Sequence, residues 1–252
     1  MEINKIYNED CLLTMKRLDG KVNAIITSPP YNIIRPNSTD RGYDVYKDNK
    51  SNDDYIKWTL DIFNSYDKIL KKDGVVLYNM SYGTENTILM SLVVADIIRK
   101  SNFTLADIIV WKKQTATPNN VSHNKMTRIV EYIYVFCRKD EFNTFNCNKK
   151  KLKERKTGQS IYENVFNFIT AKNNDSSNDL NKATYSTDLV RKLLLLYTKE
   201  NDLIYDSFMG TGTTANACII EKRNFIGSEI SKDQCIFSEK RIKNLLDQQT
   251  LF

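Results

Sequence analysis

The sequence predicts an α/β fold in which a twisted, mostly parallel sheet is covered by helices on both faces. The first observation is a series of short apolar runs, rich in β-branched residues, which are typical of buried strands. The second is a set of longer segments between them whose apolar residues recur at helical spacing. The third is their alternation along the chain, because strands that alternate with helices favour parallel pairing.

Six apolar runs are predicted strands, and five amphipathic segments are predicted helices. The strands are Val22–Thr27, Val75–Asn79, Ile108–Trp111, Tyr132–Cys137, Leu203–Asp206 and Phe225–Glu229. The helices are Asp54–Ile69, Leu89–Arg99, Asp188–Tyr197, Thr213–Glu221 and Lys232–Leu246. The polar run before Asp54 marks the expected start of the first helix, and Gly74 marks its expected stop.

Two polar segments interrupt this alternation. Ile33–Asn52 follows a proline pair and is expected to form a long mobile loop. Phe142–Asn181 is polar and basic, and between Lys149 and Lys156 it carries six positive charges against one negative charge. The second segment is therefore expected to be either a linker or a loop that contacts an acidic partner.

Composition excludes some classes of site. The five cysteines are scattered without a C-x-x-C pair, which favours a reduced, cytoplasmic protein without a metal site or a disulfide framework. The only histidine, His123, excludes any site that needs two histidines, and we expect it at the surface. No apolar run is long enough to predict a membrane span or a signal peptide. The formal charge of +6 fits a nucleic-acid partner but is common among soluble proteins.

A glycine-containing loop follows the predicted strand Leu203–Asp206. Gly210 and Gly212 lie between this strand and the helix that Thr213 opens, so the backbone can approach a ligand closely. Glu229 ends the next predicted strand, where a carboxylate can accept hydrogen bonds from both ribose hydroxyls. A P-loop lysine and a third glycine are absent, so a cofactor with a ribose and no phosphate fits best. The alternative is a loop whose glycines serve turn geometry alone.

A proline pair follows the predicted strand Val22–Thr27, in the order Ser28-Pro29-Pro30-Tyr31-Asn32. Two prolines remove two backbone donors and restrict the carbonyls of Ser28 and Pro29. Methyl transfer to an aryl amine needs such fixed acceptors, because they localise the nitrogen lone pair. Ser28 and Pro29 could be these acceptors, and Tyr31 could stack on a base turned out of the duplex. The alternative is a rigid turn without a catalytic role.

Together, TSPPYN and FMGTGTT resemble the motifs of amino-methylating DNA methyltransferases, the N4-cytosine and N6-adenine enzymes of restriction-modification systems. In that family an Asp, Asn or Ser precedes Pro-Pro and an aromatic residue, and the cofactor motif is often D-P-F-x-G-x-G-T-T. Here the catalytic motif comes first, with about 180 residues between Ser28 and Gly210, which is similar to the β arrangement of the family. The resemblance extends over nearly the whole chain.

The resemblance implies an S-adenosylmethionine-dependent methyltransferase fold in one domain, residues 1–252. Its catalytic half would span about 1–141, a basic target-recognition loop region about 142–181, and the cofactor-binding part about 182–252. The chain departs from the family at Ser207, where proline is usual, and at Asn181-Lys182, where His-Pro is usual. The catalytic positions implied are Ser28, Pro29, Pro30 and Tyr31. The cofactor positions implied are Asp10, Asp206, Phe208, Gly210, Gly212, Thr213, Glu229 and, less directly, Thr184.

The target base is open between two amines. Serine at position 28 is similar to the N4-cytosine enzymes and favours cytosine, whereas Asn32 is frequent among N6-adenine enzymes. C5-cytosine methylation is disfavoured because no cysteine follows a proline to act as the nucleophile. Double-stranded DNA is the expected partner, and its phosphates would be contacted by basic side chains. The residues expected to do so are Arg35, Arg41, Lys149, Lys150, Lys151 and Lys153.

Two other functions stay open at this stage. One is methylation of RNA or of a protein amide, for which the opposite motif order is more usual. The other is a cofactor-binding DNA-recognition subunit that has lost turnover. The resemblance also allows a homodimer and a cognate restriction endonuclease that acts on the same site.

Overall fold

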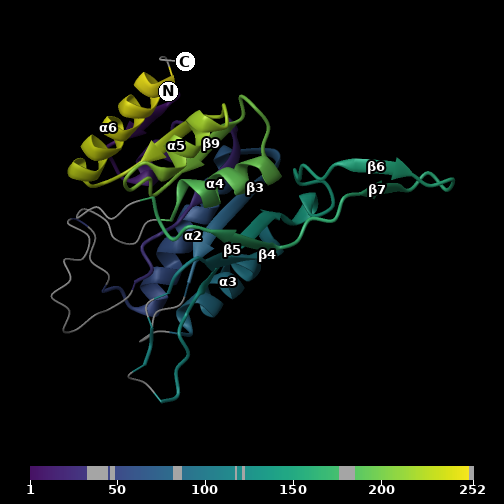
Figure 1. The fold of residues 1–252 in the computed structure, drawn as a ribbon. Coiled ribbons are helices and arrows are strands. Elements are labelled where there is room, and N and C mark those ends of the chain that lie inside the picture. Colours follow the sequence, from purple (N-terminus) through teal and green to yellow (C-terminus); the bar gives the residue numbers. More distant parts are fainter. Residues whose placement is uncertain are drawn as a thin grey trace.

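The computed structural model describes residues 1–32, 45, 49–81, 87–116, 118–120, 123–175 and 185–249. These residues form an eight-stranded sheet with the strand order β1-β10-β9-β2-β3-β5-β4-β8 (Figure 1). The strands are β1 (Lys5–Tyr7), β2 (Val22–Thr27), β3 (Leu70–Met80), β4 (Phe103–Lys113), β5 (Val130–Arg138), β8 (Phe168–Ala171), β9 (Leu203–Asp206) and β10 (Asn224–Ser228).

Most neighbouring strands of this sheet run parallel. The five strands β1, β10, β9, β2 and β3, taken in sheet order, pair in parallel. Strand β8 is parallel to β4, whereas β5 is antiparallel to both β3 and β4. This arrangement confirms the predicted mostly parallel sheet. Strands β1, β10, β9, β2, β3 and β4 therefore all end at one edge of the sheet, and β5 begins there.

Helices cover both faces of the sheet, as predicted (Figure 1). Ile25 of β2 belongs to a buried cluster with residues of α1, α2 and α3, whereas its neighbours Ala24 and Ile26 belong to a second cluster with residues of α4 and α5. Alternate side chains of one strand thus enter two separate cores. The helices are α1 (Cys11–Met15), α2 (Asn52–Ile69), α3 (Leu89–Lys100), α4 (Thr187–Tyr197), α5 (Thr213–Ile220) and α6 (Lys232–Gln249).

Helix α2 ends at Ile69, as predicted, but begins before its predicted start. Its N-cap is Ser51, whose Oγ accepts a hydrogen bond from the Asp54 amide at 3.1 Å, so the helix begins at Asn52. The expectation that Gly74 stops the helix is wrong, because α2 ends at Ile69 and Gly74 lies within β3. A Cβ atom on Gly74 would lie 2.8 Å from the Asn23 carbonyl oxygen. This glycine therefore allows β3 to pass close to β2.

The basic segment contains regular structure, so the expectation of a linker or loop there is wrong for its described part. After the short 3₁₀ helix Lys139–Glu141, strands β6 (Lys151–Glu154) and β7 (Ser160–Tyr162) pair as an antiparallel ribbon. The ribbon projects from the body of the molecule (Figure 1). Strand β8 then returns to the main sheet and pairs with β4. The sequence did not predict these strands because β6 is exposed along its whole length and neither strand contains an apolar run.

In the described part of the chain, no helix is both long and apolar enough to cross a membrane. Cys11, Cys137, Cys218 and Cys235 are buried free thiols, and Cys147 is an exposed one.

Candidate active site

The candidate site lies at the edge of the sheet where the parallel strands end. In open α/β sheets, ligands bind outside the carboxyl ends of the strands. Both sequence motifs lie at this edge, since Ser28 directly follows β2 and the glycine loop directly follows β9. The two strands are neighbours in the sheet, with Ala24 paired to Ile204. The fold thus brings together motifs that are about 180 residues apart in the sequence.

The glycine loop has a backbone conformation that favours glycine. Gly210 and Gly212 have φ angles of +54° and +83°, in the left-handed region. A Cβ atom on Gly212 would also lie 3.0 Å from the Cβ atom of Ser238 on α6. The Ser238 hydroxyl donates a hydrogen bond to the Gly210 carbonyl at 2.8 Å. The loop is therefore held tightly between β9, α5 and α6, with its amides near the start of α5.

Glu229 lies beside this loop, at the end of β10. Its two carboxylate oxygens accept hydrogen bonds from the amides of Gly210 and Ser231, at 2.8 and 2.9 Å. A carboxylate oxygen can accept more than one hydrogen bond, so these contacts leave the group able to receive ribose hydroxyls. Asp10 follows β1, the next strand, and is exposed; its Oδ1 caps α1 by accepting from the Leu12 amide at 2.8 Å. The two acids thus end adjacent strands.

Asp206 has a different environment from the other predicted cofactor residues, because it is buried and holds four donors. Its Oδ1 accepts from the Thr27 hydroxyl at 2.7 Å and the Phe208 amide at 3.0 Å. Its Oδ2 accepts from the hydroxyls of Thr214 and Tyr185, at 2.5 and 3.1 Å. Burial raises the pKa of Asp206, and these hydrogen bonds act in the opposite direction. Asp206 therefore holds the loop in place through four hydrogen bonds.

The remaining predicted cofactor positions are placed as follows. Phe208 is half-buried, and its ring centroid lies 5.4 Å from that of Trp58 on α2. Thr213 is buried at the first position of α5. Thr184 lies outside the described residues. Its neighbour Tyr185 is buried and joins Asp206 and Thr214 through its hydroxyl, and burial raises the pKa of Tyr185.

Helix α2 anchors the proline pair. Pro29 and Pro30 are buried, and the Pro30 carbonyl accepts a hydrogen bond from the buried Tyr55 hydroxyl at 2.7 Å. Ser28 is half-buried at the end of β2. The backbone of the catalytic loop is therefore anchored, while the Ser28 hydroxyl faces a cluster of polar side chains described next.

Two polar side chains from neighbouring strands contact the loop: Asn79 contacts both Ser28 and Tyr31, and Glu131 contacts Tyr31. Asn79 on β3 donates from Nδ2 to the Tyr31 hydroxyl at 2.9 Å, to Ser28 Oγ at 3.4 Å and to Glu131 Oε2 at 3.2 Å. The Tyr31 hydroxyl lies 3.3 Å from Ser28 Oγ and donates to Glu131 Oε2 at 3.2 Å. Glu131 lies near the start of β5 and forms an ion pair with Lys113 of β4. The strand ends thus enclose the catalytic loop with a connected polar network.

Asn32, the residue that suggested an adenine target, has a structural role. It is buried, and its side-chain amide donates to the Lys50 carbonyl at 2.8 Å and accepts from the Lys50 amide at 3.0 Å. Its φ of +54° is in the left-handed region that asparagine tolerates well. Both polar atoms of the side chain thus bind the backbone of Lys50, which lies just before α2. Asn32 therefore holds the backbone after the proline pair against the residue before the α2 N-cap.

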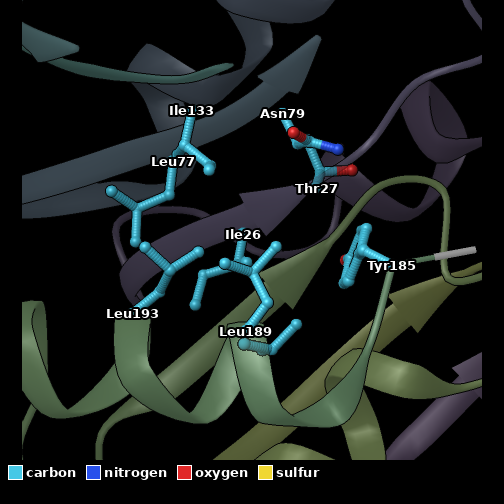
Figure 2. A pocket seen from close by; sticks show the side chains of 9 residues that line it. Ile26, Thr27, Leu77, Asn79, Ile133, Tyr185, Leu189 and Leu193 are labelled. Atoms are coloured by element: carbon cyan, nitrogen blue, oxygen red, sulfur yellow. The ribbon is translucent and has the colours of Figure 1, made fainter. Parts of the chain in front are cut away.

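A small internal cavity lies beneath the site, between the sheet and α4 (Figure 2). The Oδ1 atom of Asn79 is buried and accepts no hydrogen bond from any described residue. The orientation of this side-chain amide is therefore set by the hydrogen bonds that its Nδ2 atom donates. The cavity has a volume of about 10 Å³, room for about one water molecule, which makes it a gap in the packing and not a ligand site. The lining residues are Ile26, Thr27, Leu77, Asn79, Ile133, Tyr185, Leu189, Val190 and Leu193.

The predicted DNA-contacting lysines lie on or beside the ribbon. Lys151 and Lys153 are exposed on β6, and Lys149 and Lys150 precede it and are exposed. Glu154 forms an ion pair with Lys151 at 2.6 Å and so reduces the net charge of the ribbon. Arg35 and Arg41 lie outside the described residues. The structure therefore gathers four of the six predicted basic residues on one projecting element.

Sequence reasoning missed Asn79, Glu131 and Lys113. Each lies at the end or start of a predicted strand, on the edge that holds the catalytic loop. The polar identity of residues at strand termini was the available signal. This signal needs the strand order as well. Glu131 lies at this edge only because β5 runs antiparallel to its neighbours, and the sequence does not show that direction. Among the described residues, no group of three or more His, Cys, Asp or Glu could hold a metal ion.

The fold and the two motifs agree with comparisons against known proteins. A family model for DNA methylases of the N6 and N4 amino-methylating type matches residues 22–240. The chain belongs to this DNA methylase family.

One individual relative and two solved structures each share a quarter or less of their aligned residues with this chain. The type II methyltransferase M.BglII of Bacillus subtilis is 25% identical across 92% of this chain, which spans 66% of that protein's length. The solved structure of the cytosine-N4-specific PvuII DNA methyltransferase superposes with a TM-score of 0.73 at 18% identity, covering 97% of this chain and 91% of that one. The M1.HpyAVI–SAM complex gives a TM-score of 0.64 at 24% identity, covering 94% and 98%. These likenesses confirm the predicted methyltransferase fold.

Proposed function

We propose that this protein transfers a methyl group from S-adenosylmethionine to the exocyclic N4 amino group of cytosine in duplex DNA. The observation that carries the proposal is the position of Ser28. Its hydroxyl lies in an anchored loop at the end of β2, next to the loop of β9, and the 2.7 Å hydrogen bond from Thr27 to Asp206 ties the two strand ends together. A nucleophile held by Ser28 would thus lie next to a cofactor held by Gly210–Thr213.

The site fits S-adenosylmethionine in its donor set. The loop of Gly210 and Gly212 lets a ligand approach the backbone, and Glu229 and Asp10 supply carboxylates at the ends of adjacent strands. We assign Glu229 to the ribose hydroxyls and Asp10 to the adenine, with Phe208 and Thr213 as further contacts. When bound, the cofactor supplies an electrophilic methyl group on a sulfonium. The crystal structure of M1.HpyAVI with SAM supports this choice within the fold.

The protein's part in the reaction is to hold and activate the amine. The lone pair of an aryl amine is delocalised into the ring, so acceptors against its hydrogens localise that lone pair as the methyl arrives. We assign the Ser28 hydroxyl and the Pro29 carbonyl as these acceptors. Tyr31 would stack on the target base after it has left the duplex. The prolines and the Tyr55–Pro30 hydrogen bond would keep the acceptors from moving during transfer.

Cytosine is favoured over adenine by Ser28, because serine at this position is similar to the N4-cytosine enzymes. The feature that favoured adenine, Asn32, has both amide atoms bonded to the Lys50 backbone. DNA would be contacted by the ribbon lysines and by Arg35 and Arg41, through the phosphates. The proposal includes a homodimer and a restriction endonuclease acting on the same site, both from the family resemblance alone.

A transfer assay tests the proposal directly. The protein is incubated with labelled S-adenosylmethionine and unmethylated duplex DNA, and label in the DNA is counted beside a binding titration of the cofactor. We expect transfer by the native chain. We expect Ser28→Ala to reduce transfer at least roughly 100-fold, because an acceptor in the transition state is lost. Cofactor affinity should stay within a few-fold.

Three results would refute this proposal. Cofactor binding without any label in DNA would identify a recognition subunit and not an enzyme. A loss of cofactor binding in Ser28→Ala would show that Ser28 belongs to the cofactor site. Label in RNA or protein but not in DNA would redirect the proposal to the alternative substrates.

A further inference from the structure

A chain of hydroxyl groups leads from the candidate catalytic serine to a carboxylate on another strand. Ser28 Oγ lies 3.3 Å from the Tyr31 hydroxyl, which lies 3.2 Å from Glu131 Oε2. The other oxygen of Glu131 forms the ion pair with Lys113, whose Nζ also lies 5.3 Å from the centre of the Trp111 ring. Neither Glu131 nor Lys113 has a part in the function as proposed above.

The donors and acceptors in this chain fix its direction. An ionised carboxylate only accepts hydrogen bonds, so the single hydroxyl hydrogen of Tyr31 goes to Glu131. The Tyr31 oxygen can then only accept from Ser28, which means that the Ser28 hydroxyl donates to Tyr31. Ser28 Oγ is left with its lone pairs as acceptors, and one of them receives Asn79 Nδ2 at the long distance of 3.4 Å. The network therefore turns the acceptor side of Ser28 toward an incoming amine.

Glu131 is also held in one orientation beside Tyr31. Its side chain is 15% exposed, so solvent screens its charge only partly, and Lys113 and Asn79 hold it in one orientation. An ion pair between adjacent strands is often only structural. Here, however, the carboxylate oxygen that faces away from Lys113 accepts from both Tyr31 and Asn79, the two side chains that touch Ser28.

We infer that Glu131 is a positioning residue that orients the Ser28 hydroxyl through Tyr31 and takes the proton released by the methylated amine. During transfer the sulfur–methyl bond breaks and the nitrogen–methyl bond forms, which leaves the amine nitrogen with a positive charge. The nitrogen then gives one proton to Ser28 Oγ, Ser28 gives its own to Tyr31, and Tyr31 gives its own to Glu131. Glu131 finally releases the proton to water. This inference rests on the proposed function.

Single-turnover rates of three variants test the inference. Glu131→Gln keeps the shape of the side chain but removes the proton acceptor, and Tyr31→Phe keeps the stacking ring but breaks the chain. We expect each to lower the methyl-transfer rate by roughly 100-fold, the lower range for general acid–base catalysis. The double variant should be no more than a few-fold slower than either single variant, because both remove the same path. The Kd values for S-adenosylmethionine and for duplex DNA should change less than about threefold.

Asp96→Asn is the matched control, since it removes an ion-paired carboxylate on α3, 2.8 Å from Lys100, and should leave the rate unchanged. Thermal unfolding and cofactor binding of every variant establish that it is folded. Losses that multiply in the double variant, or a Glu131→Gln rate near that of the native chain, would overturn the inference while leaving the proposed function intact. Absence of transfer by the native chain would instead refute the proposed function.

Discussion

Asp206 shows how one residue connects the halves of the site. Its carboxylate receives Thr27 from β2, Thr214 from α5, Tyr185 from the segment before α4 and the amide of Phe208. The cofactor loop and the catalytic strand therefore share one buried acceptor. Removing such a group would leave several buried donors without a partner. Asp206 thus fixes the relative position of the two loops.

Gly212 is the loop residue at which a methyl group should be most damaging. Gly212→Ala places an L-residue at a φ of +83°, which costs roughly 1–2 kcal/mol, and its Cβ would press on Ser238. We expect both a lower free energy of unfolding in urea and weaker binding of S-adenosylmethionine by calorimetry.

Gly20→Ala is the matched control. Gly20 has a φ of +56°, no atom lies within 4 Å of the position that its Cβ would take, and it lies away from the loop. This variant should lose a similar backbone energy without weakening cofactor binding. Equal loss of cofactor affinity in both variants would mean that Gly212 affects binding only through global stability.

At the scale of elements, the β6–β7 ribbon is the part of the described structure best shaped to reach outward. It projects from the sheet with exposed lysines, whereas the helices pack against the two cores (Figure 1). A two-stranded ribbon is narrow enough to enter the major groove of DNA. Its lysines can also neutralise phosphates, which gives affinity that falls with added salt.

A triple substitution tests the role of the ribbon. Lys149, Lys150 and Lys153 replaced by Gln should weaken binding to duplex DNA and reduce the slope of log K against log salt concentration by up to about 3. Binding of S-adenosylmethionine should not change. Fluorescence anisotropy over a salt series measures the slope.

The control replaces three lysines at the starts of other strands, on the same edge of the sheet from which the ribbon projects. Lys68, Lys199 and Lys222 are exposed and precede the starts of β3, β9 and β10. The same change in net charge at these strand starts should leave the slope nearly unchanged. An equal loss in both triple variants would indicate a general effect of charge and no specific contact by the ribbon.

At the scale of the whole molecule, the sequence predicted six of the eight strands of the central sheet and missed the short strands β1 and β8. Its buried strands are uninterrupted apolar runs, and the limits of β2 and β9 were predicted without error. Local patterns also predicted the proline-pair loop and the glycine loop as the candidate site, because prolines and glycines have strong backbone preferences, and the fold places both loops at one edge of the sheet. The ribbon escaped prediction, since exposed strands have no apolar periodicity to detect.

The polar network at the site could not be read from the sequence for a different reason. Tyr31, Asn79 and Glu131 are separated by 48 and 52 positions, and only the order of β2, β3 and β5 brings them together. Asn32 is a related case, since the sequence linked it only to adenine enzymes, whereas the fold shows that its side chain binds the Lys50 backbone. Long-range pairing, and not residue type, decides both cases.

The identity of the methylated nucleoside tests the proposed function most directly. Duplex DNA is methylated by the native chain with S-adenosylmethionine, digested to nucleosides and analysed by mass spectrometry against standards. We predict N4-methylcytosine. N6-methyladenine would contradict the choice of base, and 5-methylcytosine or no methylated nucleoside would contradict amino methylation by this site.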